Sequence, residues 1–108
     1  MLPDLLRLRP LLVERPWGGR RLRDLGRDLP AAVPVGESWE VADLVSPEGE
    51  RCTFVASGEL AGMRLVDVMR QFGRDFMGSA AAGSDGRFPL LVKLLDAREH
   101  LSVQVHPP

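Results

Sequence analysis

Near the end of the sequence, three polar side chains share one face of an expected strand, and two of them, Gln104 and His106, are candidates for metal coordination. Residues 101–106 alternate between apolar and polar types, and a β-strand would place Ser102, Gln104 and His106 together on one face. Ligands two positions apart on a strand are separated by about 6.6 to 7 Å along the backbone, within reach of a common ion. An imidazole nitrogen and an amide oxygen suit zinc or a similar divalent metal. A hydrogen-bonded polar strand face without a metal is the alternative.

Lys93 is a second candidate, because it is the only lysine among 14 basic residues and it interrupts an apolar run at 88–95. An ammonium group on a buried strand carries a large desolvation cost unless it is paired or opens onto a wet cavity. Such a lysine could bind an anion or tune a proton transfer. The alternative is an edge position from which the side chain extends its amine to water.

Two tryptophans, a glutamate and a run of arginines offer less specific chemistry. Trp17 and Trp39 could stack on a sugar, although a core position is the commoner role of a lone tryptophan. Glu37 could be a cavity carboxylate or a solvated surface residue. The arginines within 20–27 could attract a phosphate, although such runs are commonly solvated faces.

The surrounding pattern predicts strands with one helix. An edge strand or an extended arm is expected at residues 5–14, and strands are expected at 37–43, 51–56, 88–95 and 101–106. A turn at 46–49 predicts that the strands at 37–43 and 51–56 form a hairpin. A short helical turn is expected before Gly26. Helical spacing of apolar residues predicts an amphipathic helix that ends near Gly73, its stripe formed by Leu65, Val68, Met69 and Phe72. The glycine-rich residues 78–86 predict a loop.

The composition fits one modest globular core. The chain has 108 residues, and 14 basic against 15 acidic residues give a formal net charge of -1, which argues against nucleic-acid and membrane-surface binding. The single cysteine, Cys52, excludes an internal disulfide and a thiolate zinc cluster. The sequence has neither a signal-peptide core nor an apolar run of the ~18 residues that a membrane span needs. We therefore expect a cytoplasmic protein.

Four segments of the sequence form an ordered series of motifs. They are Pro-Trp-Gly-Gly at 16–19, Gly-Glu-Ser-Trp-Glu at 36–40, Phe-Pro-Leu-Leu-Val-Lys-Leu-Leu-Asp-Ala at 88–97 and Leu-Ser-Val-Gln-Val-His-Pro at 101–107. Together they resemble the N-terminal part of a type I phosphomannose isomerase, also called mannose-6-phosphate isomerase. The resemblance implies a mainly β fold with a helical insertion, an incomplete cupin-type β-jelly roll. It also implies that residues 1–108 are the N-terminal portion of the catalytic domain, truncated after the first zinc-ligand motif.

The resemblance further implies a zinc-dependent isomerisation of mannose 6-phosphate and fructose 6-phosphate, in carbohydrate metabolism and GDP-mannose biosynthesis. Gln104 and His106 match the family's first two ligands of one zinc ion. Lys93 matches an active-site position that orders the substrate or stabilises charge, rather than the general base. The positions that match substrate-contacting residues are Trp17, Glu37 and Ser102.

The family's remaining zinc ligands, a glutamate and a second histidine, and an active-site arginine come from later in the chain. Two protein ligands are too few for a typical zinc site. We therefore expect a complementing C-terminal portion as partner and an exposed sheet edge. The substrate that the resemblance implies is a hexose 6-phosphate. A non-catalytic cupin-like remnant or binding module is the alternative. A further possibility is that His100, Glu37 or Glu40 completes a local metal site.

Overall fold

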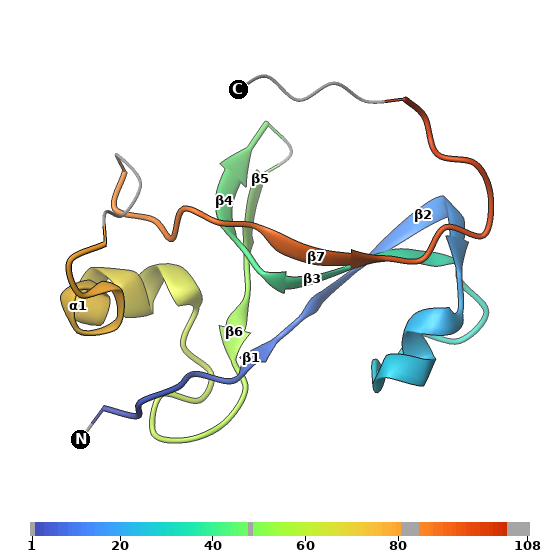
Figure 1. The fold of residues 1–108 in the computed structure, drawn as a ribbon. Helices are drawn as coiled ribbons and strands as arrows, with labels where there is room; N and C mark the ends of the chain where they lie inside the picture. Colours follow the sequence, from blue (N-terminus) through green and yellow to red (C-terminus); the bar gives the residue numbers. More distant parts are fainter. Residues whose placement is uncertain (1, 48, 81–84, 104–108) are drawn as a thin grey trace. The chain divides into compact units, whose positions relative to one another are not determined.

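The computed structural model describes residues 2–47, 49–80 and 85–103. The chain forms two compact units, the first from Met1–Leu11 with Trp39–Lys93 and the second from Leu12–Ser38 with Leu94–Pro108. In chain order, the elements are β1 (Leu8–Arg9), β2 (Leu11–Gly19), the 3-10 helix η1 (Arg21–Leu25), β3 (Val35–Val41), β4 (Asp43–Ser46), β5 (Gly49–Cys52), β6 (Phe54–Val55), α1 (Leu65–Met77) and β7 (Val92–Leu95) (Figure 1). The strand orders are β1-β6, β4-β5 and β2-β3-β7.

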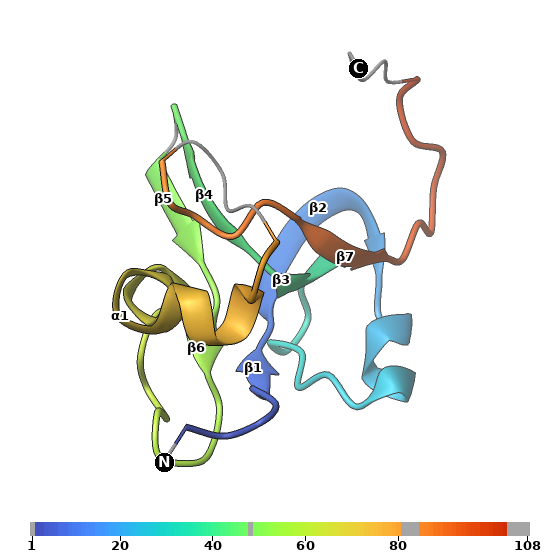
Figure 2. The same ribbon diagram turned by 60° about the vertical axis from the view of Figure 1, so that its left-hand side comes forward.

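The core of the first unit forms where α1 packs on β5 and β6 (Figure 2). The predicted stripe faces this core: Leu65, Val68 and Met69 are buried, and Phe72 packs against them. Cys52 of β5 and the last residue of β6 contribute the facing side. The amphipathic spacing therefore predicts both the helix and its buried face.

The helix continues past its predicted end near Gly73. Phe72 departs from helical geometry, with φ -130° and ψ 18°, and the helix then resumes as far as Met77. Phe76 and Met77 pack against the same core, so burial of apolar surface favours this last turn. Gly78 follows with a φ of 60°, a positive angle that glycine adopts readily.

A hairpin forms at the predicted turn, but its strands are β4 and β5, whereas most of the strand expected at 37–43 belongs to β3, which pairs with β2 and β7. They pair antiparallel, from Asp43 opposite Cys52 to Ser46 opposite Gly49. The Ser46 hydroxyl donates to the carbonyl of Gly49 at 3.2 Å. The turn that joins the strands is therefore placed where its sequence predicts it.

The strand expected over 51–56 divides into β5 and β6 at Thr53, which is fully buried. The Thr53 N–H donates to the carbonyl of Ala42 at 2.9 Å, and its own carbonyl accepts from the Leu65 N–H at 2.8 Å. Beyond Thr53 the chain changes partner, because β6 pairs with β1. The pattern of apolar residues does not reveal a change of hydrogen-bonding partner, so the division at Thr53 is not predicted from the sequence.

The first strand was expected to end at residue 14, and that expectation is wrong. Pro10 separates β1 from β2, and β2 runs through Pro16 to Gly19. β2 is an outer strand in the order β2-β3-β7, a position where a strand tolerates a proline without an N–H. The predicted helical turn forms as η1, and Gly26 ends it with a φ of 82°.

The last two predicted strands are shorter or absent in the described residues. Only Val92–Leu95 of the 88–95 segment is a strand, and it is exposed rather than buried: Leu90 is 61% exposed, and Val92 and Leu95 are exposed as well. Residues 101–103 are not a strand, and Val103 is 98% exposed. Within the described residues nothing covers these apolar side chains, so they stay exposed although their sequence pattern predicts buried strands.

The fold is therefore mainly β with one α-helix, as predicted. Among the residues that the structure describes, no helix has the length and apolar character needed to cross a membrane. The described residues on either side of 81–84 lie in turns or irregular structure, in line with the loop expected at 78–86.

Candidate active site

Glu37 occupies a buried position on β3 in the second unit. The residue is only 3% exposed, and its Oε2 accepts a hydrogen bond from Nε of Arg15 on β2 at 2.6 Å. The Arg15 side chain is 41% exposed, so solvent reaches this pair from the arginine side. Glu37 is thus a buried carboxylate with a charged partner, and its alternative role as a solvated surface residue is wrong.

The backbones of β2 and β3 approach closely at two glycines, and the Trp17 ring packs on one of them. A Cβ at Gly36 would lie 2.7 Å from both the Trp17 ring and the Arg15 Cβ. A Cβ at Gly18 would lie 2.4 Å from the backbone nitrogen of Gly36. Only glycine fits at these two positions. The Trp17 ring therefore packs on the residue that precedes Glu37 on β3.

Asp96 is a buried carboxylate in the same unit that the sequence patterns did not single out. Its Oδ2 accepts from the Arg21 N–H at 2.8 Å, and its own N–H donates to the carbonyl of Gly36 at 2.8 Å. A cavity of about 320 Å³ adjoins it, lined by Arg21, Leu22, Asp24, Leu25, Leu95, Asp96 and Ala97. The available signal was an acidic residue directly after an apolar strand.

The arginines near η1 hold the local backbone. Arg20 Nη1 donates to the carbonyls of Pro30 and Val33, at 2.5 and 2.9 Å. Arg27 Nη1 donates to the carbonyl of Leu25 at 2.6 Å. Two arginines of the run that could attract a phosphate, Arg20 and Arg27, therefore bind backbone carbonyls.

Lys93 belongs to the first unit and lies on β7, which is an outer strand of its sheet. The residue is exposed, so the premise of a buried strand is wrong and the alternative of an edge position holds. Its Nζ lies 5.8 Å from the centroid of the Trp39 ring, and the Arg51 guanidinium lies 5.1 Å from the same centroid. Trp39 itself is 8% exposed, which confirms a core position.

The remaining predicted site residues are not assembled in the described part of the chain. Ser102 is exposed and outside any strand. Gln104 and His106 lie outside the described residues. Within 2–47, 49–80 and 85–103, no group of three or more His, Cys, Asp or Glu side chains could hold a metal ion. The local site that His100, Glu37 or Glu40 would complete also needs Gln104 and His106, so it stays a prediction.

A charged network in the first unit fastens the chain after 81–84 to the β4-β5 hairpin. The buried Asp43 carboxylate accepts from Arg87 Nη1 at 2.8 Å and from the Phe88 N–H at 2.9 Å. Arg87 Nη2 also donates to Glu50 at 3.0 Å, and Arg64 forms a further ion pair with Glu50. The hydrogen bond from Arg87 is the main cause that lowers the pKa of Glu50. The same bond raises the pKa of Arg87.

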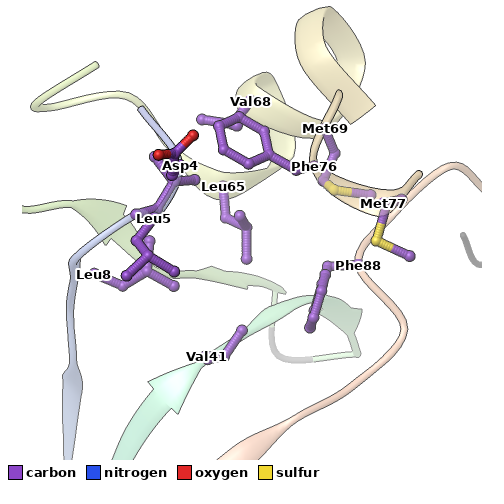
Figure 3. A pocket seen from close by; sticks show the side chains of 11 residues that line it. Asp4, Leu5, Leu8, Val41, Leu65, Val68, Met69, Phe76, Met77 and Phe88 are labelled. Carbon is purple, nitrogen blue, oxygen red and sulfur yellow. The ribbon is translucent and has the colours of Figure 1, made fainter. Parts of the chain in front are cut away.

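The first unit also contains an apolar cavity of about 370 Å³ between α1 and the N-terminal segment (Figure 3). Among its described lining residues Asp4 is the only charged one, and the side chains of Leu5, Leu8 and Phe76 face the space (Figure 3). Such a lining does not suit the hexose phosphate that the family resemblance implies, because a sugar phosphate needs several polar contacts.

Cys52 is buried beneath α1, and its Sγ accepts from the Val66 N–H at 3.3 Å. Burial is the main cause that raises the pKa of this thiol. A buried thiol with a raised pKa is a poor nucleophile. Cys52 therefore has a structural role.

Comparisons with known proteins agree on one family. Residues 5–108 match the family model for the phosphomannose isomerase type I catalytic domain. The probable mannose-6-phosphate isomerase GmuF of Bacillus subtilis is 43% identical over 93% of this chain and 29% of its own length. The mannose-6-phosphate isomerase ManA of Bacillus subtilis is 36% identical over 99% of this chain and 31% of its own length.

A solved structure agrees with these sequence matches. The crystal structure of the mannose 6-phosphate isomerase from Bacillus subtilis aligns with a TM-score of 0.67 and 34% identity, over 85% of this chain and 27% of that chain. The chain thus spans less than a third of the length of these relatives. It belongs to the type I phosphomannose isomerase family.

Proposed function

We propose that the chain is part of a mannose-6-phosphate isomerase that interconverts mannose 6-phosphate and fructose 6-phosphate in the cytoplasm. The observation that carries the proposal is the buried Glu37, which is paired with Arg15 and follows Gly36, the residue on which the Trp17 ring packs, within the segment that matches the catalytic-domain model. A buried carboxylate and an aromatic ring on two neighbouring strands suit a sugar, because a carboxylate accepts from hydroxyl groups while a ring packs on C–H surface.

The reaction moves a proton between C1 and C2 of the sugar through an enediol. In our proposal Trp17, Glu37 and Ser102 orient the hexose, and the Lys93 ammonium orders the phosphorylated substrate or stabilises developing negative charge. We leave the general base unassigned among the residues of this chain. The incomplete cupin-type jelly roll that the family implies is the proposed scaffold.

We propose one zinc ion as the cofactor, with Gln104 and His106 as two of its ligands. When bound, zinc supplies Lewis acidity toward the oxygens on C1 and C2. A zinc site takes three or four protein ligands, so the others belong to the portion of the relatives without a counterpart in this chain. That complementing portion is the proposed partner.

The second candidate is a non-catalytic cupin-like remnant or binding module. The exposed apolar residues of the C-terminal third of the chain favour it, because an apolar surface of this kind suits contact with another polypeptide. They are Leu90, Leu91, Val92, Leu95, Leu101 and Val103.

Calorimetric zinc titration and a coupled assay for fructose 6-phosphate separate the two candidates. The chain is measured alone and mixed with a polypeptide that covers the missing portion of a related isomerase. We expect turnover only in the mixture, and weaker zinc binding in Gln104→Ala and His106→Ala. His100→Ala is the matched control, because His100 is the other histidine of the chain and is exposed. Zinc affinity that is equal in all variants, or a mixture that assembles without turnover, contradicts the proposal.

A further inference from the structure

Trp39 contacts two cations of the first unit through one aromatic ring. Lys93 Nζ lies 5.8 Å and the Arg51 guanidinium 5.1 Å from the ring centroid. Both distances fall within the range of about 6 Å in which a cation is attracted to the negative face of an aromatic ring. The indole is the strongest of the natural aromatic groups in this interaction.

The buried indole N–H makes the choice of tryptophan informative. Trp39 is 8% exposed, and its Nε1 has no hydrogen-bond partner among the described residues. A buried donor without an acceptor is unfavourable, and a phenylalanine here would avoid that cost. The contact between the Trp39 ring and the two cations is one that an indole makes better than a phenyl ring.

We propose that Trp39 is a positioning residue for Lys93, whose ammonium it holds above its ring. The role of Lys93 toward a hexose phosphate rests on the proposed function; the ring contact does not. A lysine side chain on an outer strand has a flexible four-carbon stem and many rotamers. Trp39 is fixed in the core, so its ring restricts the ammonium to one side of β7.

The chain offers a direct probe of this contact, because Lys93 is its only lysine. Reductive methylation with ¹³C-formaldehyde labels Lys93 Nζ and the α-amino group while keeping their positive charge. Lys93→Arg assigns the two signals by removing one. Ring currents move methyl protons above an aromatic ring upfield, so the chemical shift of the Lys93 signal reports its position over Trp39.

We expect an upfield Lys93 signal in the wild-type chain, a smaller displacement in Trp39→Phe, and the position of a free lysine in Trp39→Leu. Arg51→Gln is the matched control, because it removes the other cation and leaves the ring; the upfield shift persists there. Trp39→Phe keeps an aromatic core residue, so it provides the graded result if Trp39→Leu does not fold. A wild-type signal at the free-lysine position, or an unchanged shift in a folded Trp39→Leu or Trp39→Phe chain, overturns the proposal.

Titration with mannose 6-phosphate tests the proposed function separately. The Lys93 signal of the chain mixed with the complementing polypeptide is followed as the sugar is added. A signal that is upfield but unaffected by the sugar counts against Lys93 as a substrate contact. The ring contact is judged by the variants alone, so the two failures are distinguishable.

Discussion

The close approach of β2 and β3 predicts that a single methyl group at Gly18 disrupts the site. A Cβ there would lie 2.4 Å from the Gly36 nitrogen, 2.5 Å from the Val35 carbonyl carbon and 2.7 Å from the Gly36 Cα. All three atoms belong to the backbone, so no side-chain rotation relieves the overlap. Gly18→Ala must therefore separate the two strands that hold Trp17 and Glu37.

The same substitution at Gly73 of α1 provides the matched control. A Cβ at Gly73 meets no heavy atom within 4 Å, and alanine is favoured over glycine in a helix by about 0.5–1 kcal/mol. Inserting a methylene into a well-packed site costs about 1–3 kcal/mol, and more where backbone must move. We expect Gly18→Ala to lose at least the upper part of this range and Gly73→Ala to gain up to about 1 kcal/mol.

Urea denaturation measures the free energy of unfolding of both variants and thermal denaturation their melting temperatures, each followed by circular dichroism and by the fluorescence of the two tryptophans. For a domain of this size each kcal/mol shifts the melting temperature by about 4–8 °C. Gly18→Ala therefore melts well below the wild-type chain and Gly73→Ala slightly above it. A Gly18→Ala chain as stable as wild type would refute the reasoning, because β2 and β3 could not then approach as described.

Four further predictions concern polar side chains that form hydrogen bonds or ion pairs. Thr53→Val should lower the free energy of unfolding by about 1–3 kcal/mol, because the Thr53 hydroxyl accepts from the Ala42 N–H at 3.3 Å and donates to the Ala42 carbonyl at 3.2 Å. Thr53→Ser keeps the hydroxyl, so its free energy of unfolding should fall less in the same denaturation assay. The pKa of Glu50 is lowered in the folded chain, so the stabilisation from its ionised carboxylate is present above the ordinary pKa of 4.5 and is lost as the pH falls through the pKa of the folded state. Melting temperatures measured from pH 6 down to pH 3 should therefore fall less steeply in Glu50→Gln than in the wild-type chain. Equal slopes would contradict this prediction. Asp96→Ala should cost about 1–3 kcal/mol, because it leaves the first N–H of η1 without an acceptor, whereas Glu37→Gln should leave the melting temperature nearer to wild type and abolish turnover of the complemented enzyme.

Local patterns predict the helix and the hairpin because the forces that form them are local. Residues spaced three and four apart place Leu65, Val68 and Met69 on one face, and the structure buries that face. The turn sequence at 46–49 likewise lies between two strands that pair antiparallel. Where the division of a strand depends on a distant partner, as at Thr53, the sequence contains no local signal.

The environment of Lys93 shows a second limit of pattern analysis. An apolar run predicts a buried strand, yet the run that contains Lys93 is largely exposed. Burial needs a second surface, and within the described residues none covers β7. The composition of a strand alone therefore does not distinguish a covered face from an exposed one.

The buried carboxylates differ in the partners that the structure gives them. Asp43 and Asp96 each accept a backbone N–H from a segment far away in sequence, Phe88 in one case and Arg21 in the other. A backbone partner cannot be exchanged without opening the fold, so these two carboxylates fasten the chain. Glu37 is equally buried, and it forms an ion pair with Arg15, whose side chain solvent reaches. An arginine side chain can rotate away or share its donors, which is why the proposed function assigns the contact with a sugar hydroxyl to Glu37 rather than to Asp43 or Asp96.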